Sequence, residues 1–475
     1  MTDLLQMTIR DLLAHFREKT LSPYEYWLAV EARIDAFEPH VAALYAYDPE
    51  GARAQARASS ERWQRSAPQG ALDGVPVTLK ELIATRCQPV PLGTAASELV
   101  PAAEDAPVAA RLREDGAVIF AKTTCPDYGM LSSGLSSFHP LSRNPWDLSR
   151  NPGGSSAGAA AAAAALYGPL HIGTDIGGSV RLPAGWTGLF GLKPSHGRIP
   201  VDPYYVGRCA GPMTRCVDDA AIAMATLSRP DWRDGTSLPP NHFDWMDHEI
   251  DVRGMRIGVM LEAGCGLKAE PEIRDAVLSA AKRFEEAGAS VFEVAPVMTR
   301  AMLDGLDAFW RAKFWGDIRG LSDERRARIL PYIYRWAEKG ADVTGVAAVQ
   351  GFGQTIEMRK ACGRLFTTVD ALLTPTNPIV SYPADWASPT NDPERPFEHI
   401  AFTVPWNMSE QPAASINCGF STSGMPIGLQ IVGPRFDDMR VLKLSKLFES
   451  VTGGIRKWPS PPDHEEGRRH RPTRG

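Results

Sequence analysis

The chain has 475 residues, of which 44 % are hydrophobic and 23 % are charged, a balance typical of globular proteins and unlike that of disordered chains. Its 51 Lys and Arg residues against 56 Asp and Glu residues give a net charge of −5. No general excess of positive charge therefore draws the chain to nucleic acid or to an anionic membrane, and we expect neither among its partners.

The predicted compartment follows from what the sequence lacks. The longest run of small apolar residues, 157–166, is far shorter than the roughly 18 residues that a membrane span needs. The segment 1–20 contains acidic side chains and no uninterrupted apolar stretch, unlike a secretory signal. The seven cysteines are odd in number and form no C-x-x-C pair, which argues against a disulfide framework and a zinc cluster. The sequence thus predicts a cytoplasmic protein with no bound metal.

Strand and helix signals alternate along the chain. The first clear strand is 75–79, which ends at Lys80; a helix over 107–115, opened by Pro107, then leads into a strand over 117–123. Further strands are predicted at 170–175, 255–260, 291–294, 370–375, 414–419 and 427–433. This alternation predicts an α/β fold in which a sheet of many strands is layered with helices.

The clearest helix lies at 272–287 and ends at Gly288. Its apolar residues recur at helical spacing: Ile273, Val277, Ala280 and Phe284. The segment 304–336 is rich in aromatic residues among many arginines, and two interpretations stay open. It is either an amphipathic helical segment that covers the sheet, which we favour, or a wall of an aromatic substrate pocket.

Two Gly-Gly-Ser units, 153–155 and 177–179, flank a small-residue helix at 157–166 and a strand at 170–174. Such loops can bind phosphate, but the sequence patterns of nucleotide-binding loops are absent. Glycine pairs also permit close packing, which explains the alanine run but not the repeated serines. A third interpretation is nucleophilic, because such a turn leaves a serine hydroxyl uncrowded and lets backbone N–H groups converge where negative charge develops.

A serine nucleophile needs a base to take its proton. His139, His171 and His196 are nearby in sequence, but no spacing marks any of them. Lys80 follows an apolar strand, and burial can lower the pKa of a lysine from about 10.4 into the useful range near 7–8. The residues alone nevertheless favour the plainer interpretation, a lysine that points to water at the end of a strand.

Four segments together resemble the amidase signature hydrolases. GVPVTLKELI (74–83) resembles the family's lysine motif, and KTTCPDYGMLSS (122–133) is similar to its active-site loop. The stretch 151–200, from NPGGSSAG to GRIP, resembles the long signature itself, and 402–434 resembles the C-terminal strand pair. The resemblance covers about residues 22–450, and it reverses the expectation for Lys80.

The resemblance implies a Ser–cis-Ser–Lys triad. Ser179 matches the nucleophile, Ser155 matches the serine that relays protons, and Lys80 matches the base. The backbone amides of Ile176, Gly177 and Gly178, with that of Ser179 itself, match the oxyanion hole. Met130 and Ser132 match loop positions that flank the substrate, and Arg181 is expected to pair with Asp175 and brace the loop.

The implied fold is a large mixed, twisted sheet sandwiched by helices on both faces, without a metal or organic cofactor. We expect one domain over 1–455, with core motifs in 72–200 and 370–435, a helical covering segment at about 265–360, and a mobile tail at 456–475.

The sequence departs from the usual family pattern at five positions that lie outside the triad: Glu81, Ala157, Glu410, Gln411 and Asn417. These departures affect the expected loop geometry and, through it, the substrate preference. The implied activity is hydrolysis of a carboxylic C–N bond in a small-molecule amide, aryl amide or acyl hydrazide, through an acyl-serine. The alternative is a glutamine-hydrolysing amidotransferase subunit that needs a partner. A homodimer is a further family-level expectation.

Overall fold

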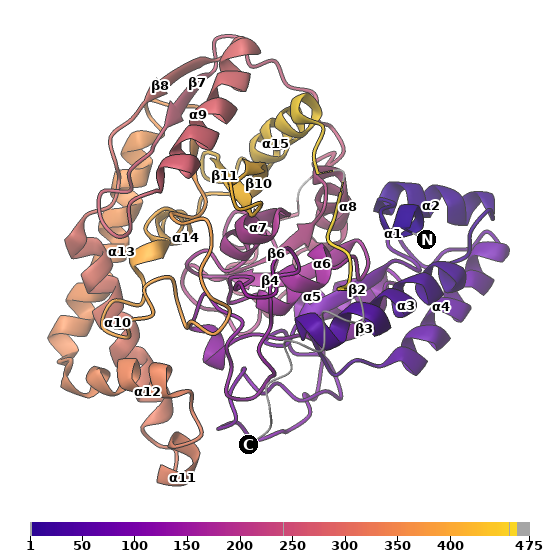
Figure 1. Ribbon diagram of the computed structural model, residues 1–475, viewed down its shortest axis with the longest axis horizontal. Helices are drawn as coiled ribbons and strands as arrows, with labels where there is room; N and C mark the ends of the chain where they lie inside the picture. Colours follow the sequence, from indigo (N-terminus) through magenta and orange to yellow (C-terminus); the bar gives the residue numbers. More distant parts are fainter. Residues whose placement is uncertain (1, 241, 456, 463–475) are drawn as a thin grey trace.

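Within the described residues, 2–240, 242–455 and 457–462, the computed structural model has one mixed sheet of eleven strands (Figure 1). Across the sheet these are β1 (Leu44–Tyr45), β3 (Val118–Thr123), β2 (Pro76–Lys80), β4 (Leu170–Asp175), β6 (Cys209–Thr214), β5 (Phe190–Lys193), β10 (Ala413–Phe420), β11 (Pro426–Val432), β9 (Ala371–Pro375), β7 (Arg256–Val259) and β8 (Ser290–Glu293). Strands β3, β2 and β4 run parallel, as do β9, β7 and β8, and the strands between these two groups pair antiparallel. The predicted α/β class with a large mixed sheet is confirmed.

The α-helices are α1 (Thr2–Leu5), α2 (Ile9–Glu18), α3 (Pro23–Val41), α4 (Pro49–Gln64), α5 (Pro107–Glu114), α6 (Ala157–Ala164), α7 (Arg181–Thr187), α8 (Val217–Leu227), α9 (Pro271–Glu286), α10 (Arg300–Ile318), α11 (Asp323–Arg326), α12 (Pro331–Glu338), α13 (Gly345–Leu365), α14 (Val404–Met408) and α15 (Asp438–Thr452). Short 3-10 turns lie at η1 (Asp127–Gly129), η2 (Lys339–Asp342) and η3 (Glu398–Ile400).

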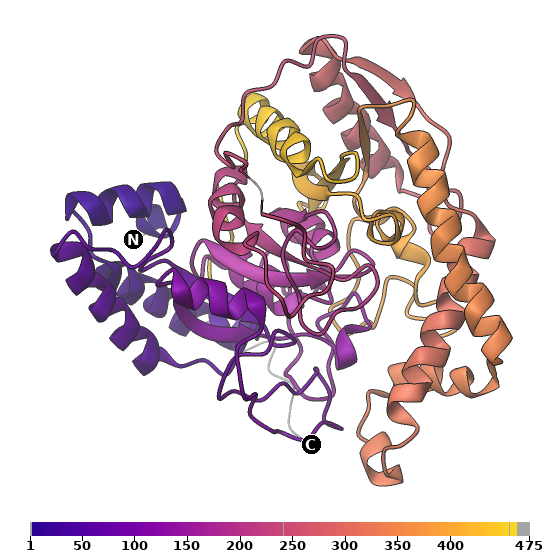
Figure 2. The same cartoon turned by 180° about the vertical axis from the view of Figure 1, so that it is seen from behind.

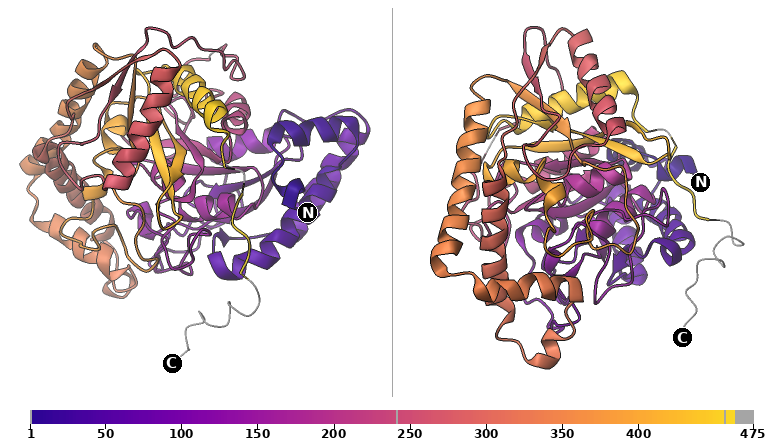
Figure 3. Two further views of the ribbon diagram at one scale, coloured as in Figure 1. Left: turned by 45° about the horizontal axis from the view of Figure 1, so that its top comes forward. Right: turned by 60° about the vertical axis from the view of Figure 1, so that its left-hand side comes forward.

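Helices cover both faces of the sheet. On one face α5, α8, α9 and α15 share a hydrophobic core with the strands, and Figure 3 shows α9 and α15 lying across β10 and β11. On the other face α6 packs on β2, β3 and β4, while α7 packs on β5, β10 and β11. The two Gly-Gly-Ser loops therefore lie on the same face, because they precede these two neighbouring helices.

Two helical groups extend the molecule at opposite ends of the sheet. Helices α1–α4 lie beyond β1 and β3, and α10–α13 lie on the far side, where α10 and α13 run side by side (Figures 1 and 2). None of the described helices is long and apolar enough to cross a membrane. The predicted tail 456–475 falls outside the described residues except for 457–462, where Trp458 packs against Trp146 with ring centroids 6.0 Å apart.

The predicted elements are confirmed with small shifts at their ends, and the four apolar residues of the 272–287 helix are all buried in α9. Strands β1, β5 and β6 were not predicted. Strand β1 has only two residues, and β5 (FGLK) and β6, which contains Gly211 and Pro212, form no uninterrupted apolar run.

Candidate active site

Lys80 is the last residue of β2, held between β3 and β4, and its side chain is fully buried. Its Nζ donates to Ser155 Oγ at 2.8 Å and to Thr174 Oγ1 at 3.0 Å. Burial lowers the pKa of this amine to about 8, because removal from water penalises the charged form. The expectation that the residues alone favoured, a lysine pointing to water, is therefore wrong.

Ser155 lies in the loop that enters α6, and the Gly154–Ser155 peptide bond is cis. The next residue ties this loop to the second Gly-Gly-Ser unit: Ser156 N donates to Ser179 O at 3.3 Å, and Ser156 Oγ donates to Thr174 O at 3.2 Å. Two serine loops that are 24 residues apart in sequence thus meet at the ends of β2 and β4.

The alanine-rich helix α6 permits this approach. A Cβ on Gly158 would lie 2.3 Å from Ala43 O and 2.4 Å from Thr124 N, which leaves no room for a side chain. All eight residues of α6 are buried, so small residues here serve close packing under the sheet.

Asp175, at the end of β4, organises the loop that carries Ser179. Its carboxylate accepts from the amides of Gly178 at 2.8 Å and Val180 at 3.1 Å, and from Arg181 Nη2 at 2.9 Å. Burial by itself raises the pKa of Asp175, but the adjacent Arg181 guanidinium outweighs it and holds that pKa well below its usual range. The pairing expected between Arg181 and Asp175 is present, with both side chains fully buried.

The backbone amides of the Ser179 loop divide into two groups. The amide of Gly178 already donates to Asp175, so it is not free for a substrate oxygen as the resemblance implied. Within the described part of the chain, the amides of Ile176, Gly177 and Ser179 have no hydrogen-bond acceptor, and these three residues line a cavity. Gly178 adopts φ +130°, and a Cβ there would lie 2.5 Å from Thr403 Oγ1, so the loop requires glycine at this position.

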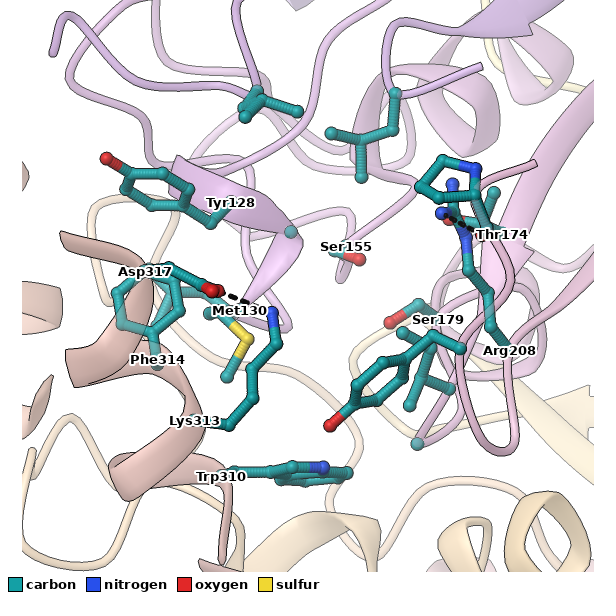
Figure 4. A pocket seen from close by; sticks show the side chains of 18 of the residues that line it. Tyr128, Met130, Ser155, Thr174, Ser179, Arg208, Trp310, Lys313, Phe314 and Asp317 are labelled. Carbon is teal, nitrogen blue, oxygen red and sulfur yellow. Dashed lines mark hydrogen bonds and ion pairs between the residues drawn. The ribbon is translucent and has the colours of Figure 1, made fainter. Parts of the chain in front are cut away.

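The cavity has a volume of about 590 Å³, and Ser155 and Ser179 both lie on its wall (Figure 4). A large part of the cavity wall is aromatic and apolar: Tyr128, Trp310, Phe314, Phe397 and Ile400. The Phe314 ring stands edge-on to Tyr128, with centroids 4.7 Å apart. Trp310 stands edge-on to Phe397 at 5.1 Å. The two serines therefore share the cavity with a largely hydrophobic lining.

The aromatic segment 304–336 satisfies both of its interpretations. It is helical, as favoured, and α10 shares a hydrophobic cluster with strands β9–β11. Trp310 and Phe314 of α10 also line the cavity, so the same helix forms a pocket wall.

Met130 and Ser132 line the cavity, in the loop where sequence analysis expected them. Ser132 Oγ lies 2.6 Å from Nε2 of His399, and burial lowers the pKa of His399 to about 3, so this imidazole is neutral. Neither His399 nor Arg208 was predicted from the sequence, because both lie outside the four recognised segments. The only signal available was their nearness to those segments in the chain.

The three histidines considered as alternative bases lie elsewhere. His171 contacts Thr78 Oγ1 at 2.8 Å within the sheet, and His196 lies 3.3 Å from Thr236 Oγ1. The Nε2 atom of His139 lies 3.4 Å from Glu81. Among the described residues that line the cavity, none is one of these three histidines.

The departures from the family pattern lie around the cavity rather than in it. Glu81 is buried and accepts from Cys125 Sγ at 3.0 Å, and Ala157 is the buried first residue of α6. Glu410 forms an ion pair with Arg359 at 2.6 Å. Gln411 is buried just before β10, and Asn417 is half-buried within that strand.

Comparison with known proteins shows that the family model described as Amidase matches residues 25–442 of this chain. The chain belongs to the amidase signature family. This amidase is 34 % identical to a glutamyl-tRNA(Gln) amidotransferase subunit of Chloroflexus aggregans, over 95 % of this chain and 98 % of that protein.

Two solved structures share the fold of the amidase. A bacterial aryl acylamidase of the amidase signature family superposes with a TM-score of 0.86 and 28 % identity, over 94 % of this chain and 96 % of the other. The 6-aminohexanoate cyclic dimer hydrolase, solved with its substrate, superposes with a TM-score of 0.87 and 25 % identity, over 96 % of this chain and 99 % of the other. The chain is therefore an amidase-type C–N hydrolase by family.

Proposed function

We propose that this amidase cleaves the C–N bond of a small-molecule amide, aryl amide or acyl hydrazide through an acyl-serine on Ser179. Ser155 acts as the proton relay and Lys80 as the base. The observation that carries the proposal is the 2.8 Å contact between the Lys80 amine, whose pKa is about 8, and Ser155 Oγ, because Ser155 lines the same cavity as Ser179.

In the first half-reaction neutral Lys80 takes the proton of Ser155, and Ser155 takes the proton of Ser179. The Ser179 oxygen then forms a bond to the carbonyl carbon. The amides of Ile176, Gly177 and Ser179 are free to donate to the oxyanion that develops. The C–N bond breaks as Ser155 gives its proton to the leaving nitrogen and recovers one from Lys80.

In the second half-reaction water replaces the amine. Lys80, again neutral, draws a proton from water through Ser155, and the hydroxide attacks the acyl-serine carbonyl. The ester C–O bond breaks, Ser179 regains its proton through the same relay, and the carboxylic acid leaves.

The cavity supports a substrate with an aromatic or apolar part. Its volume of about 590 Å³ is larger than a side-chain amide as small as that of glutamine requires, and such an amide has no ring to contact the aromatic wall. An aryl amide, or an acyl hydrazide with an aromatic acyl group, would place a ring against Trp310 and Phe314, where an aromatic pair contributes about 0.5–1.5 kcal/mol beyond the buried area.

A glutamine-hydrolysing amidotransferase subunit is the second candidate. It is favoured by the 34 % identity to a glutamyl-tRNA(Gln) amidotransferase subunit over nearly the whole of both chains. Such a subunit needs a partner that receives ammonia. Fast hydrolysis of anilides or hydrazides by the purified chain, with no turnover of glutamine, would exclude this candidate.

The test is a panel of anilides, alkyl amides, esters, acyl hydrazides and glutamine, with mass spectrometry of the rapidly quenched protein. We expect turnover of aryl substrates and an acyl adduct on Ser179. Ser179→Ala should form no acyl adduct, and its turnover should fall by about 10³-fold or more, while it still binds substrate. Near wild-type turnover of Ser179→Ala would refute the assignment of the nucleophile.

A further inference from the structure

Two cations line the cavity, and they differ in how their charge is balanced. Lys313 of α10 forms an ion pair with Asp317 one turn later, and its Nζ lies 5.4 Å from the centre of the Tyr205 ring. Figure 4 shows this pair on one side of Ser155 and Ser179, with Arg208 on the other side.

Among the described residues, Arg208 has no such carboxylate partner. Its Nη1 donates to Pro203 O at 2.9 Å, and its remaining guanidinium N–H groups find no acceptor among the described residues. Asp202 also lines the cavity, and its charge favours the protonated form of Arg208, but the two side chains form no ion pair within the described chain. By contrast the guanidinium of Arg181, behind the same wall, bonds to Asp175, Gln430 and Asn407.

A half-buried guanidinium with free N–H donors can bind a further hydrogen-bond acceptor. Burial lowers the pKa of Arg208, which records the loss of water around the charge, yet an arginine stays protonated in proteins. The planar fork of donors matches the two oxygens of a carboxylate, and such charge-assisted bonds are about twice as strong as neutral ones.

The guanidinium is also close to the chemistry. Burial is the main cause of the lowered pKa of Lys80, and the positive charge of Arg208 lowers that pKa further. Arg208 also lines the same cavity as Ser179. A carboxylate bound there would belong to the molecule whose amide lies at Ser179, with the aromatic wall of α10 on the opposite side (Figure 4).

We propose that Arg208 binds a carboxylate of the substrate, so that the preferred substrates are amides that carry a carboxylate at one end and an apolar or aryl group at the other. This inference rests on the proposed function and narrows its substrate class. Arg208 is then a specificity-determining residue of the amidase.

The test compares carboxylates with neutral analogues of the same shape. One pair, 4-acetamidobenzoate and 4-nitroacetanilide, carries the difference on the leaving group. The other pair, N-phenylsuccinamate and levulinanilide, carries it on the acyl group. Release of the arylamine gives kcat/KM for the wild type, Arg208→Gln and Arg208→Lys. Arg253→Gln, an exposed arginine far from the cavity that pairs with Asp251, is the matched control.

We expect Arg208→Gln to lower kcat/KM for the carboxylate of at least one pair by about 10- to 100-fold, as for a hydrogen bond to a charged group, and to change its neutral analogue far less. Arg208→Lys should be intermediate, because it keeps the charge without the fork. Arg253→Gln should change none of the four. Equal losses within both pairs, or no loss in either, would overturn the inference.

A binding measurement separates this inference from the proposed function. Calorimetry with Ser179→Ala, and with Arg208→Gln added to it, reports the affinity for both carboxylates without turnover. A loss of affinity on adding Arg208→Gln supports the site even where the wild type turns over no amide, which would refute the proposed function alone. Asp202→Asn in the same background should strengthen carboxylate binding, since it removes a nearby negative charge. Unchanged or weaker binding would contradict a carboxylate site at Arg208, because the charge of Asp202 beside that site should oppose the carboxylate.

Discussion

The two walls of the cavity hold their side chains by different means. The serine wall is fixed by buried polar bonds: Asp175 alone accepts from two loop amides, from Arg181 and from Asn407. The α10 wall is fixed by edge-on aromatic contacts between Phe314, Trp310 and their neighbours. Hydrogen bonds weaken steeply when their angles change and so fix the position of the loop, whereas aromatic side chains supply a large apolar contact area, so the first wall suits chemistry and the second suits recognition.

This contrast predicts unequal responses to substitution. A change in the polar bonds behind the serine wall should remove chemistry or stability, whereas a change in the α10 wall or at Arg208 should alter which substrates bind. A substitution in either wall can be compared with the same kind of change at a similar residue outside the cavity, which tests the contrast between the walls.

The largest effect is expected from substitution of Lys80, and Lys122 provides the control. Both lysines are buried on adjacent strands, and burial lowers the pKa of each to about 8. Lys122 Nζ, however, bonds to Ile83 O and to Thr85 Oγ1 and does not reach a serine of the cavity. Lys80→Ala should reduce kcat/KM for an anilide by about 10³-fold or more, and Lys122→Met by less than about 10-fold. Comparable losses in both would mean that a buried lysine matters only for the fold.

The second experiment tests the polar bonds of the serine wall. Asp175→Asn leaves Arg181 buried without its counter-charge, which should lower the free energy of unfolding by about 3–5 kcal/mol. Asp251→Asn breaks the exposed pair with Arg253 and should change that free energy far less, because water screens the pair. Denaturant unfolding measures both. Similar values for the two variants would refute the structural role assigned to Asp175.

The pH dependence tests the base. Lys80 must be neutral to accept a proton, so kcat/KM should rise about tenfold per pH unit below a midpoint near 8 and then level off. Because the positive charge of Arg208 adds to burial in lowering the pKa of Lys80, Arg208→Gln should move this midpoint to higher pH. A wild-type midpoint between about 6 and 7, the range of an ordinary histidine, would contradict Lys80 as the base.

The smallest effect is expected from the α10 wall. Phe314→Leu removes a ring that stands against Tyr128, and it should raise KM for an aryl amide by about 2- to 10-fold while kcat changes little. Phe352→Leu changes a ring of α13 that stands edge-on to Phe309 outside the cavity, and it should leave KM unaltered. A loss confined to kcat for Phe314→Leu would assign this wall to chemistry instead.

Much of the fold was predictable from local pattern. The 272–287 helix follows directly from periodicity, because it buries one face, and the strands near 118–123 and 427–432 follow from short apolar runs. Strands β5 and β6 were missed because their short sequences, FGLK and CAGPMT, contain glycine, lysine or proline and form no uninterrupted apolar run.

The sequence by itself determined the residues available for catalysis and, through the resemblance of four segments, their family. Only the tertiary structure decided how they act. Packing between β3 and β4 excludes water from Lys80 and turns it toward Ser155, while the Asp175 carboxylate draws away the Gly178 amide that the resemblance had given to the oxyanion. Burial and hydrogen-bond competition depend on segments far apart in the chain, so no local pattern encodes them.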